Sequence, residues 1–403
     1  MPRSYPWDGI FHFECRYTVN MSETFYPIHQ FPSPDAPPPV KKIKQRYLLH
    51  IGLFLVTVVT CVMAGAQWMG RDPNEIDNWG YGVTYATLLL LFLTAHEFGH
   101  YIAARIHKVD ATLPFYIPML STLSMFGTMG AVIRTRSQVS SRKVMFDIGV
   151  AGPIAGFIVC MGILIWGMTH LPPIEYLYSI HPYLQGMKVL PPYGLTFGNN
   201  ALYWLFAKIF VPSGTFLPPM NEMYHYPFLC AGWFGLFVTS LNLLPIGQLD
   251  GGHLTFGLFG SRHLTISRLF FFVMIVLGLL GLYDELALDG VINARPLFVG
   301  WVGWLFWALM VRFIIKLKHP PVPDMAPLDR RRKIIGWATV AIFLVTFSPL
   351  GIFQIPMGFK MPQRNHEKEN GAVPVMFHTK TMNTPSHAAS GVVSTDCLRE
   401  PVL

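Results

Sequence analysis

Long apolar stretches constrain this chain of 403 residues more than any other feature of its sequence. Seven of them cover about residues 47–70, 81–104, 145–168, 226–247, 266–283, 296–316 and 334–353. Because a helix needs roughly 20 apolar residues to cross a bilayer core, each stretch predicts a span or a near span. Charged residues make up only 13% of the chain, against about 25% in soluble globular proteins. We therefore expect an all-α polytopic membrane protein with about six or seven transmembrane helices.

Basic residues are distributed around these stretches in a pattern that predicts an orientation. Lys41, Lys42, Lys44 and Arg46 precede the first stretch, whereas the loop 284–294 after the fifth contains no Lys or Arg. Cytoplasmic loops are enriched in Lys and Arg, so the amino terminus is expected in the cytoplasm. The net charge of +8 is explained by such clusters beside apolar runs, and we expect no nucleic-acid partner.

The sequence predicts three regions of different character. Residues 1–46 form a cytoplasmic amino-terminal segment, 47–353 a membrane domain, and 354–403 a polar, disordered tail. Within the membrane domain, 169–225 is a proline-rich outside loop in which Ala201 to Phe210 is expected to form an interfacial helix.

One segment of the membrane domain is too broken for a helix and too apolar for an ordinary loop. Residues 112–143 contain Pro114, Pro118, Gly127 and Gly130 among apolar residues. We expect Phe126 to Ile133 to form an extended or hairpin element that dips into the membrane, where protein or a water-filled cavity satisfies its backbone.

The second apolar stretch ends in the sequence His96-Glu97-Phe98-Gly99-His100. On a helix, positions i and i+4 share one face, so His96 and His100 can direct ring nitrogens at one metal ion. Glu97 lies beside that face and can reach a metal-bound water without being a ligand. Burying these three side chains without a metal or a polar partner would cost several kcal/mol. The pattern therefore predicts a metal site of the metalloprotease type.

A catalytic zinc site needs a third protein ligand and an open fourth position. Asp250 is the leading candidate because Pro245 and the Gly251-Gly252 pair are expected to break the fourth helix there and turn the carboxylate inward. His253 is a rival third ligand, and Asp147 a lesser one.

Three motifs together resemble the site-2 protease family of intramembrane zinc metalloproteases. They are the HExxH segment, Ala151-Gly152-Pro153 in the third stretch, and the Asn242-to-Gly252 stretch with its Leu-Asp-Gly-Gly element. The resemblance covers about residues 82–260 and is greatest to the bacterial and plastid branch. One departure is Gly247, where many relatives have proline.

The resemblance implies a function for these residues. His96, His100 and Asp250 would hold one zinc ion (Zn2+) per chain, Glu97 would be the catalytic base, and Asn242 would lie beside the reacting carbonyl. The residues 47–353 would then form a membrane metalloprotease domain with its core at 82–260. Substrates would be membrane-spanning proteins cut within the bilayer, and the chain would reside in the bacterial inner membrane. The oligomeric state is not predicted.

Two other functions compete with this one. A metal transporter would also place His and Asp residues within spans, but it would need a polar path through both leaflets, which spans one, six and seven lack. A non-proteolytic relative could retain the fold as a scaffold, but it would have no need for Glu97. A second metal site at His170, His181 and His225 in the outside loop is a minor alternative, and Trp301, Trp304 and Trp307 are expected to face lipid or pack.

Overall fold

The computed structural model of the protein describes residues 45–120, 124–135, 139–187, 189–320 and 322–357. Within these residues the chain is mostly helical. Three helical segments are long and apolar enough to cross a membrane: Tyr47–Trp68, Arg142–Thr169 and Asp250–Leu288. The predicted class of an apolar, helical membrane protein is therefore confirmed, whereas the count of six or seven spans stays a prediction.

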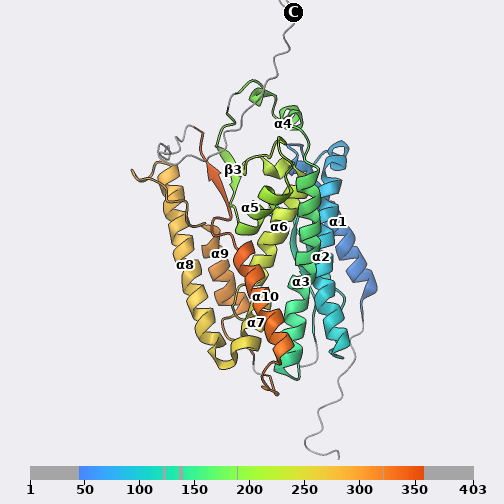
Figure 1. Ribbon diagram of the computed structural model, residues 1–403. Helices are drawn as coiled ribbons and strands as arrows, with labels where there is room; N and C mark the ends of the chain where they lie inside the picture. Colours follow the sequence, from blue (N-terminus) through green and yellow to red (C-terminus); the bar gives the residue numbers. More distant parts are fainter. Residues whose placement is uncertain (1–44, 121–123, 136–138, 188, 321, 358–403) are drawn as a thin grey trace, which may run out of the picture. The chain divides into compact units, whose positions relative to one another are not determined.

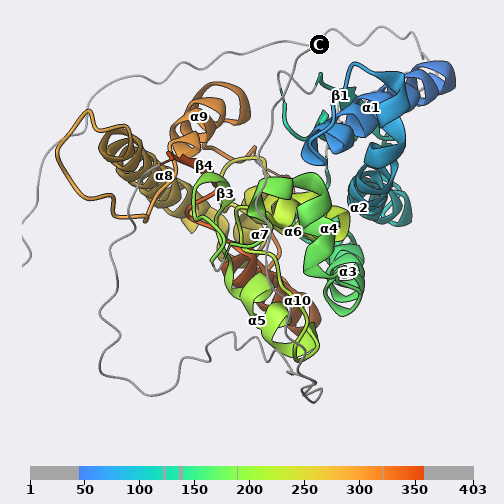
Figure 2. The same cartoon turned by 90° about the horizontal axis from the view of Figure 1, so that it is seen from above.

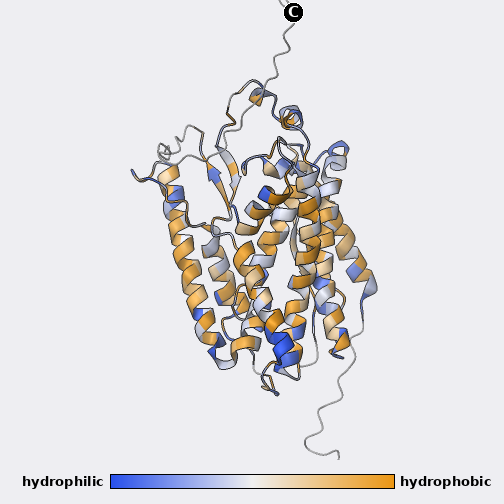
Figure 3. Ribbon diagram, viewed as in Figure 1, coloured by the Kyte–Doolittle hydropathy of each residue, from blue (hydrophilic) through white to orange (hydrophobic). Residues whose placement is uncertain are grey.

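Each of the seven apolar stretches contains a helix. The helices are α1 (Tyr47–Trp68), α2 (Trp79–Ile106), α3 (Arg142–Thr169), α6 (Pro227–Asn242), α8 (His263–Leu288), α9 (Gly303–Met310, continued by a π-helical turn at Val311–Ile315) and α10 (Arg330–Thr346). Their ribbons are hydrophobic along most of their length, and hydrophilic segments gather near their ends (Figure 3). Helical hydrogen bonding satisfies the backbone within each segment, which an apolar environment requires.

The helices α1, α2, α3 and α6 pack side by side around the main core (Figures 1 and 2). Aromatic side chains fill this core, and Tyr85, Phe92, Trp233, Phe234 and Phe237 are each at most 2% exposed. The short helix α7 (Asp250–Phe259) packs against α3, and the turn Gly260–Arg262 connects it to α8. This arrangement brings the first residue of α7 to the face of α2 that carries His96 and His100.

The predicted hairpin follows α2. Strand β1 (Phe115–Pro118) pairs antiparallel with β2 (Thr128–Val132), with an irregularity in the register between Tyr116 and Pro118. The Tyr116 hydroxyl lies 2.7 Å from that of Thr94 on α2, which attaches the hairpin to the helix. The extended or hairpin element expected at Phe126 to Ile133 is present as strand β2, and its partner β1 lies before that range. Its depth in the membrane stays a proposal.

The segment between α3 and α6 is more ordered than the sequence suggested. It contains α4 (Ile174–Ile180), β3 (Gly194–Phe197) and α5 (Ala201–Phe210), together with single turns at Pro182–Leu184 and Met223–His225. The predicted helix at Ala201 to Phe210 is confirmed as a helix. Another single turn, Ile76–Asn78, precedes α2.

A pairing that the sequence analysis missed joins this segment to the end of the chain. Strand β3 pairs antiparallel with β4 (Ile352–Ile355), so Gln354 and Ile355 belong to a strand and not to the predicted disordered tail. That boundary was wrong because a four-residue strand gives little signal without its distant partner. The predictions for residues 1–44 and 358–403 lie outside the described residues.

Candidate metal centre

Helix α2 places His96 and His100 one turn apart with their rings directed at the same point. Both side chains are buried, and their Nε2 atoms are 3.1 Å apart. Glu97, also buried, lines the same cavity from the adjacent position on the helix. The predicted i, i+4 geometry is therefore present in the structure.

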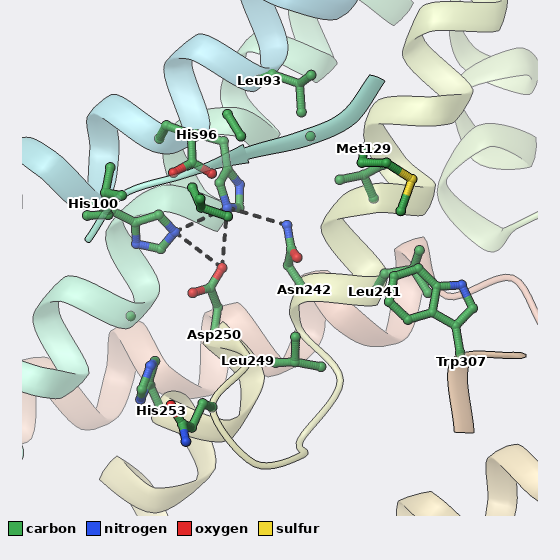
Figure 4. Close-up of a pocket in the computed structure, with 18 of the residues that line it drawn as sticks. Leu93, His96, His100, Met129, Leu241, Asn242, Leu249, Asp250, His253 and Trp307 are labelled. Carbon is green, nitrogen blue, oxygen red and sulfur yellow. Dashed lines mark hydrogen bonds and ion pairs between the residues drawn. The ribbon is translucent and has the colours of Figure 1, made fainter. Parts of the chain in front are cut away.

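Asp250 reaches the histidine pair from the first residue of α7. Its Oδ2 atom lies 3.3 Å from the Nε2 atom of His96 and 3.3 Å from that of His100 (Figure 4). Four tetrahedral ligands with zinc bonds of 2.0–2.1 Å are separated by about 3.4 Å. The three donor atoms therefore have the spacing of three corners of a zinc coordination tetrahedron.

The backbone of α3 orients His100. The carbonyl oxygen of Ile148 lies 2.7 Å from His100 Nδ1, and it accepts a hydrogen bond when that nitrogen carries the proton. This tautomer leaves the Nε2 lone pair free for a metal, an arrangement typical of metal-bound histidines. A Cβ atom added at Gly152 would lie only 2.1 Å from His100 Nε2. The histidine therefore needs glycine at this position of α3.

The loop between α6 and α7 carries two more candidate residues at its ends. Asn242 is the last residue of α6, and its Nδ2 atom lies 3.4 Å from His96 Nε2. Gly247 within the loop has φ +56°, a value that proline cannot adopt, so the glycine here is a backbone requirement.

The predicted helix break is only partly correct. Pro245 lies in the break, but Gly251 and Gly252 belong to the first turn of α7. Gly251 lies so close to the end of α6 that an added Cβ would be 2.0 Å from the carbonyl oxygen of Leu243. The glycine pair therefore permits close backbone packing and does not end a helix.

The two rival ligands have other partners. Asp147 pairs with His107 at 2.9 Å and with Arg332 at 2.7 Å, away from the histidine pair. His253 Nδ1 lies 2.8 Å from His319 Nε2. The geometry favours Asp250 over both as the third member of the group.

A cavity of about 870 Å³ opens beside the three donor atoms. Its walls come from α2, the strand β2, the end of α6 and the segment around α9. Apolar side chains such as Met129, Leu241 and Trp307 line it at a distance from the polar group (Figure 4). Trp301 also lines the cavity. Trp304 is fully buried and packs in the core, which is one of the two roles predicted for these tryptophans.

Comparison with known proteins indicates one family. The model of peptidase family M50 matches residues 84–281, a range that contains His96, His100 and Asp250. This match confirms the resemblance that the sequence motifs predicted, because peptidase family M50 is the site-2 protease family.

The chain is also similar to several plant proteins. It is 32% identical over 263 residues to "Probable zinc metalloprotease EGY1, chloroplastic" of Oryza sativa subsp. japonica, covering 59% of this chain and 42% of that protein. The Arabidopsis thaliana protein of the same name is 28% identical over 256 residues, covering 59% and 44%. "Probable zinc metalloprotease EGY3, chloroplastic" of Oryza sativa subsp. indica is 26% identical over 313 residues, covering 76% and 48%. The chain thus spans less than half the length of these relatives, and no solved structure matches it.

The residues that support the donor group were not predicted from the sequence. The carbonyl of Ile148 gave no signal because every residue has one, and only the crossing of α2 and α3 selects it. Gly152 was visible as part of a motif, but its contact with His100 depends on the same crossing. The pairing of Arg332 with Asp147 was also not predicted, because 185 residues separate them along the chain.

Proposed function

We propose that this chain is an intramembrane zinc metalloendopeptidase that hydrolyses peptide bonds in the membrane segments of other proteins. The observation that carries the proposal is the convergence of His96, His100 and Asp250 on one point, with the buried Glu97 beside it in the same cavity. The match to family M50 and the names of the relatives support the same activity and the same metal.

The donor set fits zinc. Two imidazole nitrogens and one carboxylate oxygen are ligands that zinc accepts, and three protein ligands leave a fourth position for water or substrate. When bound, zinc would lower the pKa of a water molecule to about 7 and polarise a peptide carbonyl. His96, His100 and Asp250 would hold the ion, and Ile148 would keep His100 in the tautomer that binds it.

The remaining polar residues of the site have distinct roles in this proposal. Glu97 takes a proton from the attacking water and delivers it to the leaving amine, as a general base and then a general acid. Asn242 can donate its amide N–H to the oxygen of the reacting carbonyl, because Nδ2 lies beside His96 at the same cavity. The apolar walls limit access of bulk water to this chemistry.

Strand β2 provides a surface for an unwound substrate. A helical substrate hides its peptide bonds in its own hydrogen bonds, so it must become extended before attack. Residues 128–133 line the cavity while β1 pairs with the strand over Phe115 to Pro118. An extended substrate could pair with the backbone of β2 and so present its carbonyl to the polar group.

Proline at Met129 tests this substrate surface. Met129→Pro removes a backbone N–H from β2 and should lower cleavage at least tenfold, whereas Met129→Ala shortens the side chain and keeps the N–H. Both variants should retain zinc, measured by metal analysis of the purified protein. Unchanged cleavage by the proline variant would exclude β2 as the docking strand.

The membrane and the orientation are also part of the proposal. The positive-inside pattern supports an amino-terminal segment on the cytoplasmic side, with 47–353 as the protease domain, 82–260 as its core and 169–225 outside. The relatives are named chloroplastic, so the comparisons give no support to the bacterial inner membrane that we expected from the sequence.

Glu97→Gln separates catalysis from metal binding. The substitution keeps the size of the side chain and removes its basicity, so the variant should retain zinc and lose cleavage of a single-span substrate by at least about 10²-fold. Glu75→Gln, at an exposed position before α2, is the matched control and should cleave normally. A Glu97→Gln variant that still cleaves would rule out the proposed base.

A further inference from the structure

A second group of metal-ligand residues lies in the segment between α3 and α6. His181 follows α4, Glu222 precedes the turn Met223–His225, and His225 ends that turn. The two histidine Nε2 atoms are 2.9 Å apart, and each lies 3.6 Å from Glu222 Oε2. Two histidines and one carboxylate therefore converge here as well.

The spacing of this group matches that of the first donor group in the same chain. The three donor separations are 2.9, 3.6 and 3.6 Å here, and 3.1, 3.3 and 3.3 Å at His96, His100 and Asp250. Both sets lie around the value of about 3.4 Å expected between tetrahedral zinc ligands. The first turn of α2 lies near α4 (Figure 1), and His96 is 17 residues further along the helix, a distance of about 25 Å. The two groups of donor residues are therefore separate.

His225 is oriented by the backbone of α1. The carbonyl oxygen of Trp68, the last residue of α1, lies 2.6 Å from His225 Nδ1. A proton on Nδ1 satisfies this contact and directs the Nε2 lone pair toward Glu222 and His181. This is the same orientation by a backbone carbonyl that Ile148 gives to His100.

Glu222 is an unusual residue to bury without a cation. It is 5% exposed, and among the described residues none donates a hydrogen bond to its Oε2 atom. A buried carboxylate oxygen without a hydrogen-bond donor lacks the partner that would offset its desolvation, and a bound cation would supply that partner.

We propose that His181, Glu222 and His225 bind a second divalent transition-metal ion, of the zinc class, with water in the fourth position. The partly exposed side of His181 gives the ion a path of entry. The ion would join the segment after α4 to the start of α6 and, through Trp68, to the end of α1. Its role is structural, and the inference does not depend on the proposed protease activity.

Metal analysis of the purified full chain tests the proposal with single and double variants. The wild-type protein, equilibrated with zinc and then freed of excess metal, should contain two equivalents. Glu222→Gln and His181→Asn should each contain one, His100→Asn should contain one, and the double variant His181→Asn/His100→Asn none. His170→Asn, an exposed histidine of the same segment, is the matched control and should keep both.

Thermal unfolding in detergent provides a second measurement for variants that fold less well. Adding zinc to chelator-treated protein should raise the Tm of His100→Asn but not that of His100→Asn carrying Glu222→Gln. One equivalent in the wild type, lost with His100→Asn and kept in His181→Asn and Glu222→Gln, would overturn the second site. One equivalent lost only with His181→Asn would instead refute the metal at His96, His100 and Asp250.

Discussion

Gly152 shows that a residue without a side chain can determine the position of a proposed metal ligand. Helix α3 crosses α2 so closely at this point that His100 occupies the space of a Cβ atom. Glycine usually costs about 1 kcal/mol relative to alanine inside a helix. The site therefore requires a residue that is locally unfavourable.

Gly152→Ala should therefore weaken metal binding while favouring the helix. The added methyl group would displace His100, and we expect zinc affinity to fall about 10–100-fold, the usual effect of disturbing a residue that supports a ligand. Gly162→Ala is the matched control on α3, because no described atom lies within 4 Å of its added Cβ. Competition with a chelator measures both affinities, and equal values for the two variants would contradict the proposed contact.

At the residue level, the sequence predicted groups that lie close together along the chain. His96, Glu97 and His100 were predictable because helical spacing alone brings them to one face. Asp250 required an assumption about how two distant segments meet, and the structure brings its carboxylate to the pair. Glu222 was not predicted as a ligand. It lies 41 residues after His181 and 3 residues before His225, and no helical or strand periodicity connects the three residues.

Among the elements, the loop between α6 and α7 has the strictest backbone requirements. Gly247 combines a positive φ with close packing, since an added Cβ would lie 1.8 Å from the carbonyl oxygen of Lys316. The loop begins after Asn242 and ends before Asp250. A change in its backbone path therefore displaces both of these residues.

Gly247→Ala should destabilise the protein and disturb the metal centre together. We expect a loss of about 2–4 kcal/mol, combining the cost of a non-glycine residue at positive φ with that of overpacking. Gly290→Ala also has a positive φ but no described atom within 4 Å, so it should lose only about 1 kcal/mol. Thermal unfolding and zinc content are measured for both variants. Equal losses of stability in Gly247→Ala and Gly290→Ala would show that the contact with Lys316 is unimportant.

Helix positions were predictable from hydropathy, whereas strand pairing was predictable only where the two strands are close in sequence. All seven apolar stretches contain helices because an apolar run of that length has few other ways to satisfy its backbone. The hairpin at β1 and β2 was predictable from prolines and glycines close together in sequence. The pairing of β3 with β4 was not, because about 150 residues separate its strands.

In the whole molecule, we expect α4 and the turn between α7 and α8 to lie on opposite sides of the membrane. The two lie at opposite ends of the helices in Figure 1. Ser179→Cys and Ser261→Cys, both at exposed positions, should react with an impermeant thiol reagent from opposite sides, with Ser261→Cys on the cytoplasmic side. The buried Cys61, Cys160 and Cys230 should stay unreactive, and Cys15 and Cys397 should be replaced. Labelling of both positions from one side would refute the proposed topology.

The most direct measurement of the central claim is the position of the cut. A single-span protein reconstituted in lipid vesicles with the zinc-loaded enzyme should yield new ends inside its apolar segment, mapped by mass spectrometry. Glu97→Gln enzyme should yield none of them. Cuts confined to residues outside the apolar segment, or the same cuts with Glu97→Gln, would contradict intramembrane proteolysis by this site.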